Sequence, residues 1–357
     1  MTIDAVGGVW RYGMDLGAAL RSGGTEVVFA CLGPSASPAQ IAEAEAIGRF
    51  IAVPAPLDWT AVGEQDLAGI AHQLETMTAE QEIDLLHLNL PSQAAGLHVP
   101  VPVVVVSHSC VVTWFQAVRG TATPPDWQWQ GRWNRAGFAA ADAVLAPSRS
   151  HADLLTACYG PLRNLVVVHN GARSITAPSQ KEPYVLAAGR WWDDGKNGRL
   201  LDAASKGAAW PVQMAGSLNG PNGQYMPVQS AQYLGEIPNA ELRSLMARAA
   251  VFASPSIYEP FGLAPLEAAL EGSALLLSDI PTYRELWDGA AFFAPPDDPA
   301  AWSAAIDRLA ADPDLRRALG SAAAARATNY SLEAQVRAVR NVYAGLMQPA
   351  QALRRAG

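Results

Sequence analysis

Short apolar runs typical of buried strands alternate with helical patterns along the whole 357-residue sequence. Within positions 12–20, apolar residues recur at helical spacing. A Gly-Gly pair then ends the predicted helix, and the strand-like run 26–32 follows. Parallel strands need a long crossover between them, usually a helix, so this alternation predicts an α/β fold built on parallel sheets. Further strand-like runs lie at 85–88, 102–107, 143–146 and 165–169.

A polar, proline-containing segment at 174–182 lies between two strand signals and is predicted to be an interdomain linker. After it the alternation starts again, so we expect one Rossmann-like domain at 1–173 and a second at 183–330. A helix at 331–347 is expected to pack back onto the first domain. The strand-like runs of the second domain lie at 184–189, 212–215, 250–254, 274–278 and 291–294.

The composition argues against several classes of protein. A net charge of −8 disfavours a nucleic-acid partner, whose phosphates require a basic face. The apolar runs fall well short of the roughly 20 residues of a membrane-spanning helix. Cys31, Cys110 and Cys158 show no CxxC spacing, which favours a reducing cytoplasm.

The N-terminus lacks the pattern of a secretory signal, so export is not expected. Little chain precedes the Gly7-Gly8 pair. That length is too short for a full central strand, so we expect the sequence to begin inside such a strand.

The segment that follows the run 250–254 combines two glutamates with the residues of a helix start. Gly262 permits close approach of the backbone and Pro265 suits a first helical turn, so free backbone N–H groups are expected to face a ligand such as a diphosphate. Glu259 precedes this helix and Glu267 is expected in its first turn, and both carboxylates suit sugar and ribose hydroxyls. The spacing alone supports equally well an alternative, in which Glu267 complements the helix dipole and Glu259 is a solvated loop acid.

The sequence around these glutamates, YLGEIPNAELRSLMARAAVFASPSIYEPFGLAPLEAALEGSALLLSD, resembles the donor-binding half of retaining glycosyltransferase family 4, with Glu259 and Glu267 as its E-x7-E motif. The resemblance implies the GT-B fold, in which two Rossmann-like domains face each other across a cleft. It also implies that Glu267 holds the ribose of a nucleotide-diphosphate sugar and that Glu259 holds the sugar. The other donor-binding residues that it implies are Phe261, Gly262 and Leu263 at the sugar and phosphates, and Gly235 and Ile237 at the nucleobase.

Arg190 and Lys196 follow the first strand-like run of the second domain, in the segment AGRWWDDGKN. A departing nucleoside diphosphate gains negative charge as the glycosidic bond breaks, and two cations stabilise it most once that charge has built up. The alternative is that both side chains are only solvated. Because they match the strand-end Arg and the downstream Lys of the family, the resemblance implies that both are catalytic and donor-binding residues.

In the first domain, Gly7 and Gly8 stand where the first strand turns into a helix, and His108 ends the run 102–107. The glycines lack the GxGxxG spacing of a dinucleotide site, and a lone histidine after a buried strand is often structural. The resemblance implies that the glycine loop borders the donor phosphates and that His108 is a catalytic residue beside the reacting sugar. The Trp-rich stretch 114–133 hints at a carbohydrate acceptor, although helix packing explains such stretches more often.

No acidic dyad has supporting metal ligands, because Asp193-Asp194 and Asp297-Asp298 lack neighbouring His or Glu, so we expect no metal and no cofactor. With the resemblance, the sequence predicts a cytoplasmic, retaining hexosyltransferase with a nucleotide-sugar donor and a carbohydrate or other hydroxyl acceptor. The alternatives are a sugar phosphorylase or epimerase on the same fold, or a non-catalytic nucleotide-sugar-binding protein. The patterns do not encode the nucleobase, the sugar, the acceptor, the linkage or the oligomeric state.

Overall fold

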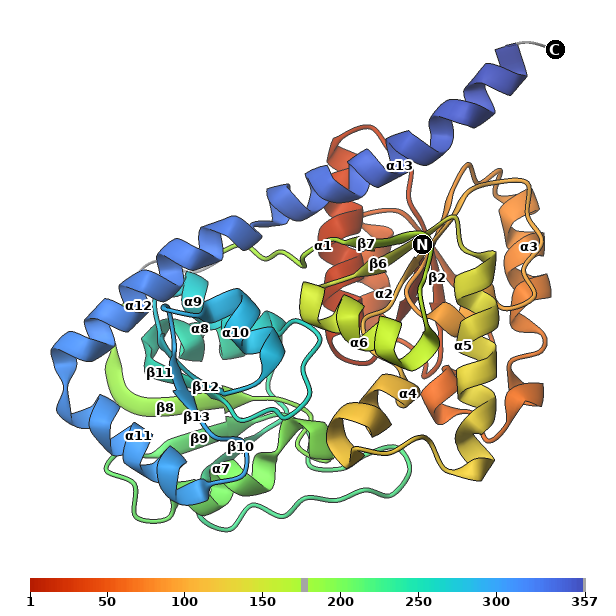
Figure 1. Ribbon diagram of the computed structural model, residues 1–357. Helices are drawn as coiled ribbons and strands as arrows, with labels where there is room; N and C mark the ends of the chain where they lie inside the picture. The colour runs from red at the N-terminus through yellow and green to blue at the C-terminus, as the bar shows by residue number, and fades with distance from the viewer. Residues whose placement is uncertain (175–178, 356–357) are drawn as a thin grey trace. The chain divides into compact units, whose positions relative to one another are not determined.

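The computed structural model describes residues 1–174 and 179–355 and divides into two compact units (Figure 1). Unit 1 contains Met1–Asn170 together with the chain from Leu332 onward, and unit 2 contains Gly171–Ser331. Residues 175–178 of the predicted linker lie outside the described residues. Unit 2 is therefore inserted, as one continuous stretch, between two parts of unit 1.

Unit 1 consists of short strands that alternate with helices. Its main elements are β1 (Thr2–Asp4), α1 (Gly8–Ser22), β2 (Val28–Leu32), α2 (Pro38–Glu45), β3 (Arg49–Ala52), α3 (Ile70–Glu80), β4 (Leu86–Leu88), β5 (Val103–Val106), α4 (Val111–Trp114), α5 (Gln128–Ala140), β6 (Ala143–Ala146), α6 (Arg149–Tyr159), β7 (Leu165–Val167) and α13 (Leu332–Arg355).

The strands of unit 1 are parallel and lie in the orders β3-β2-β1 and β4-β5-β6-β7 in the part of the chain that the structure describes. Asn89, directly after β4, ties the two sets together, because its side-chain amide donates to the backbone oxygen of Thr2 in β1 at 2.6 Å. The strand order thus reverses between β1 and β4. Ligands of open parallel sheets bind at such a switch point, beside the carboxyl ends of the strands.

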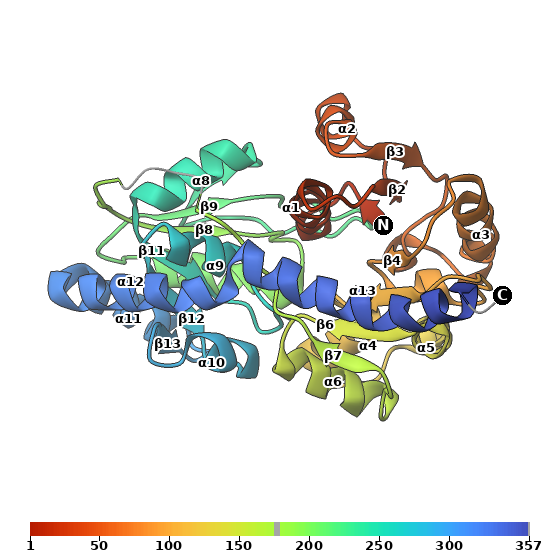
Figure 2. The same cartoon turned by 90° about the horizontal axis from the view of Figure 1, so that it is seen from above.

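Both faces of the strands in unit 1 are covered. Successive side chains of a strand point to opposite faces, so Val104 of β5 lies in the core formed with α1, α2 and α13, and Val105 lies in the core formed with α3, α5 and α6. In α13, which is longer than the helix predicted at 331–347, Val339 is fully buried. α13 packs against α1 (Figure 2), so the last helix of the sequence belongs to the core of the first unit.

Unit 2 repeats the alternation of strands and helices. Its main elements are β8 (Glu182–Ala188), the short 3-10 helix η6 (Asp194–Lys196), α7 (Gly198–Ser205), β9 (Val212–Ala215), β10 (Gln232–Gly235), α8 (Asn239–Arg248), β11 (Ala249–Ser254), α9 (Leu263–Leu270), β12 (Ala274–Ser278), α10 (Pro281–Trp287), β13 (Phe292–Ala294), α11 (Pro299–Ala311) and α12 (Pro313–Ala327).

The sheet of unit 2 is parallel and has the strand order β10-β9-β8-β11-β12-β13. The order reverses between β8 and β11, which makes the carboxyl ends of these two strands the switch point of unit 2. Helices cover both faces, with α8, α9, α10 and α12 on one side and α7 and α11 on the other (Figure 1). Phe252 of β11 lies in the core on the side of α8, α9, α10 and α12, whereas Val251 and Ala253 lie in the core on the side of α7 and α11.

The α/β fold with parallel sheets in two units confirms the predicted fold class. Each strand-like run of the sequence is a strand in the structure, with ends that differ by no more than about two residues. β3 and β10 were not predicted, because their residues are exposed or half-buried and therefore lack a continuous apolar run. Within the described residues, no helix is both long and apolar enough to cross a bilayer.

Candidate active site

Two loops meet at the switch point of unit 2. The loop after β8 carries η6, and the loop after β11 runs from Pro255 to Gly262. The backbone N–H of Ile257 donates to the oxygen of Gly195 at 2.9 Å, and the side chain of Asn197 donates to the oxygens of Pro255 and Pro296 at 3.1 and 2.7 Å. These bonds fix the two loops relative to each other within one unit.

Lys196 and Glu259, one from each loop, form an ion pair. Lys196 Nζ donates to Glu259 Oε2 at 2.5 Å, and the two side chains are 21% and 14% exposed. The sequence predicted a site role for both residues, from loops 63 positions apart. The structure brings them into direct contact, so a cation and a carboxylate stand side by side beside the carboxyl ends of β8 and β11.

Arg190 lies on the same loop as Lys196 and is more exposed. Its Nη2 is 3.9 Å from Asp193 Oδ2, and its guanidinium carbon is 5.6 Å from the centre of the Trp192 ring. Asp193 accepts a hydrogen bond from the backbone of Gly195 at 2.9 Å and so caps η6. Among the described residues, no group of three His, Cys, Asp or Glu side chains could hold a metal ion.

The start of α9 has the backbone geometry that the sequence suggested. Gly262 has a φ of 94°, in the left-handed region that favours glycine, and precedes the first helical residue, Leu263. The side chain of Phe261 is buried in the core and meets the ring of Tyr330 edge-on, with centroids 5.7 Å apart. If Phe261 contacts a ligand, it therefore does so through its backbone.

The prediction that Glu267 lies in the first turn of this helix was wrong. α9 begins at Leu263, two residues before Pro265, so Glu267 is beyond the first turn and the first turn contains no acidic residue. Proline is tolerated throughout a first turn, because the N–H groups there have no partner within the helix. The influence of the helix dipole falls off within that turn, so the dipole explanation of Glu267 loses its basis.

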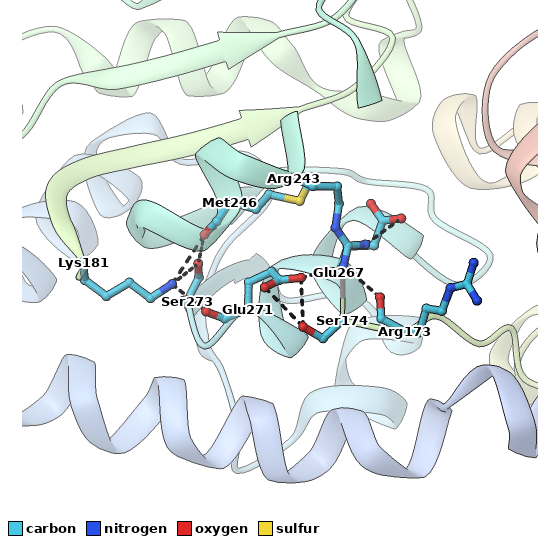
Figure 3. Close-up of polar contacts among 8 residues, drawn as sticks. All are labelled: Arg173, Ser174, Lys181, Arg243, Met246, Glu267, Glu271 and Ser273. Atoms are coloured by element: carbon cyan, nitrogen blue, oxygen red, sulfur yellow. Dashed lines mark hydrogen bonds and ion pairs between the residues drawn. The ribbon is translucent and has the colours of Figure 1, made fainter. Parts of the chain in front are cut away.

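Glu267 is instead a partner of a buried arginine (Figure 3). Arg243 of α8, 3% exposed, places Nη1 3.1 Å from Glu267 Oε1 and Nη2 2.7 Å from Glu271 Oε1. Nη2 also donates to the backbone oxygen of Arg173 at 2.9 Å. Next to this group, Lys181 donates to the backbone oxygens of Glu271 and Met246 and to Ser273, and burial lowers the pKa of Lys181 to about 8.

Arg243 was not predicted as a site residue, although the sequence carries a signal for it. Arg243 stands three and four residues before Met246 and Ala247, both of which are buried. Residues at this spacing share one face of a helix. A charged side chain on a buried helical face requires a partner, so the spacing indicates that Arg243 is paired but does not identify its partner.

Three glycines lie beside one another where β8, β9 and β10 end. Gly216 has a φ of 114°, and a Cβ atom there would lie 2.0 Å from the oxygen of Gly189. The N–H of Gly216 donates to the oxygen of Gly235 at 2.8 Å. Ile237, between β10 and α8, is half-buried. This edge of the sheet therefore offers backbone with little side-chain cover.

In unit 1, Gly7 and Gly8 lie at the switch point between β1 and β4. Gly7 has a φ of 77° and precedes the first residue of α1, Gly8, and both are exposed. The N–H groups of a first helical turn have no partner within the helix. The glycine loop thus presents unpaired backbone donors of the kind that bind anions.

His108 follows β5 at the same switch point. Its Nε2 lies 2.9 Å from Asn89 Oδ1, and its ring meets Tyr12 of α1 edge-on at 4.5 Å. Burial lowers the pKa of His108 to about 4, so the imidazole is neutral at pH 7. Asn89 was not predicted as a site residue, because a single asparagine after a three-residue strand carries no distinctive sequence pattern.

His87, in β4, contacts Tyr12, the residue whose ring also meets His108. Its Nε2 is 3.3 Å from the hydroxyl of Tyr12 and its Nδ1 is 2.7 Å from the hydroxyl of Tyr343 in α13. Burial lowers the pKa of His87 to about 3.

In the Trp-rich stretch 114–133, Trp129 is buried and Trp133 packs on the same core, as helix packing predicts.

Comparison with known proteins bears on both units. A model described as Glycosyltransferase Family 4 matches residues 6–173, and one described as Glycosyl transferases group 1 matches residues 223–326. The chain is 35% identical over 82 residues, 23% of each chain, to the O-antigen chain mannosyltransferase RfbU of Salmonella typhimurium. It is 26% identical over 219 residues to the glycogen synthase of Mycobacterium tuberculosis, covering 53% of this chain and 50% of that relative. The chain thus spans no more than about half the length of these curated relatives.

Solved structures resemble nearly the whole chain. Sucrose-phosphate synthase from Thermosynechococcus elongatus has a TM-score of 0.78 at 18% identity, with 97% of this chain and 98% of that chain covered. Alr3699/HepE from Anabaena, in complex with UDP-glucose, has a TM-score of 0.76 at 17% identity, with 97% and 100% covered. At such identities the likeness is one of fold. With the two family models, it shows that the chain belongs to the GT-B glycosyltransferases of family 4, glycosyl transferases group 1.

Proposed function

We propose that this glycosyltransferase is a retaining, metal-independent enzyme that moves a hexose-type sugar from a nucleoside-diphosphate sugar to a hydroxyl acceptor. The observation that carries the proposal is the contact of Lys196 with Glu259 at the switch point of unit 2. A cation suited to phosphate and a carboxylate suited to sugar hydroxyls are what a nucleotide sugar requires at its reacting end.

In this proposal the donor is held along one unit. The ribose binds Glu267, the diphosphate meets Arg190, Lys196 and the backbone at Gly262 and Leu263, and the sugar hydroxyls bind Glu259. The nucleobase lies against the backbone near Gly235 and Ile237. For Gly7 and Gly8 we keep the role that the family resemblance implies, at the donor phosphates, and for His108 the role at the transferred sugar.

The chemistry follows from the charge that develops on the donor. The bond between the anomeric carbon and the phosphate oxygen breaks, and the acceptor oxygen bonds to the same face of that carbon. The acceptor's proton passes to the departing phosphate oxygen. Arg190 and Lys196 stabilise the departing diphosphate, and each hydrogen bond to a charged group contributes about 1.5–3 kcal/mol.

The acceptor that we propose is a saccharide or glycoconjugate, and the reaction takes place in the cytoplasm. The relatives support this class of acceptor, since one is a mannosyltransferase of O-antigen chains and another a glycogen synthase. The glucose of the UDP-glucose bound to a protein of the same fold supports a hexose donor. The three free cysteines fit a reducing compartment.

A thermal-shift screen with UDP, GDP, ADP and their sugar conjugates tests the donor. A ligand at 100 times its dissociation constant stabilises the protein by about 2.7 kcal/mol. NMR of the product then reports the anomeric configuration. A product of inverted configuration, or binding of the donor without transfer to any of a broad set of hydroxyl acceptors, contradicts the proposal.

A further inference from the structure

Hydrogen bonds hold the side-chain amide of Asn89 at both its nitrogen and its oxygen. It is buried directly after β4. Its backbone N–H donates to Thr2 Oγ1 at 2.8 Å, and its Nδ2 donates to the backbone oxygen of Thr2 at 2.6 Å. Its Oδ1 lies 2.9 Å from His108 Nε2.

These contacts determine which amide atom faces which partner. A backbone oxygen can only accept a hydrogen bond, so the amide atom that faces the oxygen of Thr2 must be the NH2 group. The amide oxygen therefore faces His108. Thr2 Oγ1 accepts from the backbone N–H of Asn89 and donates to Gln93 Oε1 at 2.7 Å, so the hydroxyl of Thr2 has both a donor and an acceptor as partners.

The same logic reaches the imidazole. An amide oxygen only accepts, so His108 Nε2 must carry a hydrogen. In a neutral imidazole one nitrogen carries the hydrogen and the other holds a lone pair, so His108 Nδ1 is then an acceptor. An imidazolium would carry hydrogen on Nδ1 as well, and none of the contacts described above requires that second hydrogen.

The surroundings of His108 favour the neutral ring. Tyr12 of α1 meets it edge-on, and a charge on His108 would lower the pKa values of His87 in β4 and His151 in α6. Burial lowers the pKa of both histidines to about 3, so both are neutral at pH 7. The pKa of His108 itself is lowered by burial alone. We find no carboxylate acting on His108 in the described part of the chain that would stabilise an imidazolium.

We propose that Asn89 is a positioning residue that fixes His108 in the tautomer with hydrogen on Nε2, so that Nδ1 accepts a hydrogen bond from a hydroxyl of the transferred sugar. The part that concerns the sugar rests on the proposed function. The part that concerns the tautomer depends only on the contacts of Asn89.

The test is ¹⁵N NMR of the imidazole nitrogens in the full-length protein at pH 7.5, with the His108 signal assigned by its loss in His108→Gln. We expect the wild type to show a protonated Nε2 and an unprotonated Nδ1. We expect Asn89→Leu, which keeps the bulk and removes the amide, to show a mixture of both tautomers. Hydrogen on Nδ1 in the wild type overturns the proposal, whether or not Asn89→Leu folds.

Thr2→Val is the matched control. It breaks the network at Thr2 Oγ1 but keeps the backbone oxygen that orients the amide, so the tautomer should be unchanged. A spectrum that changes in Thr2→Val as much as in Asn89→Leu, or an unchanged spectrum in Asn89→Leu, contradicts a positioning role for Asn89.

Kinetics test the sugar contact separately. With the donor found by the thermal-shift screen, Asn89→Leu should lower the transfer rate at saturating donor by roughly two- to tenfold, the effect of one neutral hydrogen bond. Binding of the bare nucleoside diphosphate should be unchanged. If the tautomer is as expected but the protein transfers no sugar, the proposed function fails and the role of Asn89 stands.

Discussion

Arg243 Nη1 lies 3.1 Å from Glu267 Oε1, and the other terminal nitrogen of the same guanidinium lies 2.7 Å from Glu271 Oε1. One buried cation thus holds two carboxylates of the α9 region in place. Glu267, the residue that we assign to the ribose, is oriented by a side chain that the donor does not have to touch.

Replacing Arg243 with Met should therefore destabilise the protein severely. It leaves Glu267 and Glu271 buried without their shared cation, and removing one partner of a buried pair costs about 3–5 kcal/mol. Arg248→Met on the same helix is the control, because the Arg248–Glu182 pair is 39% and 50% exposed and such pairs contribute at most about 1 kcal/mol. Denaturant unfolding of both variants measures the difference, and equal midpoints would show that the Arg243 pairs contribute no more than surface pairs.

The two glutamates of the E-x7-E motif should differ in what they bind. Glu267→Gln should weaken binding of the bare nucleoside diphosphate and of the nucleotide sugar alike, because the ribose does not react and its contact is uniform binding. Glu259→Gln should leave the affinity for the bare nucleotide nearly unchanged and lower the transfer rate, because the sugar loses its orientation. Calorimetry with the nucleotide and initial rates at saturating donor separate the two. Equal loss of nucleotide affinity in both variants means that the roles are wrongly assigned.

Gly216→Ala should perturb the carboxyl edge of the sheet in unit 2. The added Cβ would lie 2.0 Å from the backbone oxygen of Gly189, at a φ of 114°. Gly207→Ala matches the unfavourable φ, at 80°, but has open space around its Cβ. The control should lose about 1–3 kcal/mol from backbone strain alone. Gly216→Ala should lose clearly more in thermal or denaturant unfolding, and a loss no greater than that of Gly207→Ala would mean that the backbone yields easily at Gly189.

Transfer should survive chelation, because Arg190 and Lys196 supply the positive charge at the diphosphate. We expect the rate in EDTA to stay within a few-fold of the rate without it. We expect Lys196→Met to lose about 10- to 150-fold in transfer rate, the equivalent of one hydrogen bond to a charged group. A rate that collapses in EDTA and returns with magnesium or manganese overturns metal independence.

The sequence predicts the strands of the two units because buried parallel strands are continuous apolar runs, as in β5 and β12. It does not predict the features that depend on tertiary contacts. β3 is exposed or half-buried at each residue and is recognisable only beside β2. The position of Glu267 was misjudged because Pro265 fits any place in a first turn. Neither the pairing of Glu267 with Arg243 nor the contact of His108 with Asn89 follows from spacing, because each joins separate elements that only the folded sheet brings together.

The backbone N–H of Ala172 donates to the oxygen of Tyr330 at 3.1 Å, so the chain enters and leaves unit 2 at neighbouring points. Because unit 2 lies between two parts of unit 1 in the sequence, the order of translation determines which unit can be completed first. All of unit 2 emerges before α13, whereas unit 1 still lacks Val339 in its core and the hydroxyl of Tyr343 on His87. Nascent domains usually finish in order from the N-terminus. Here the unit that is translated first is completed last, and its histidine network gains its final hydrogen bond only when α13 arrives.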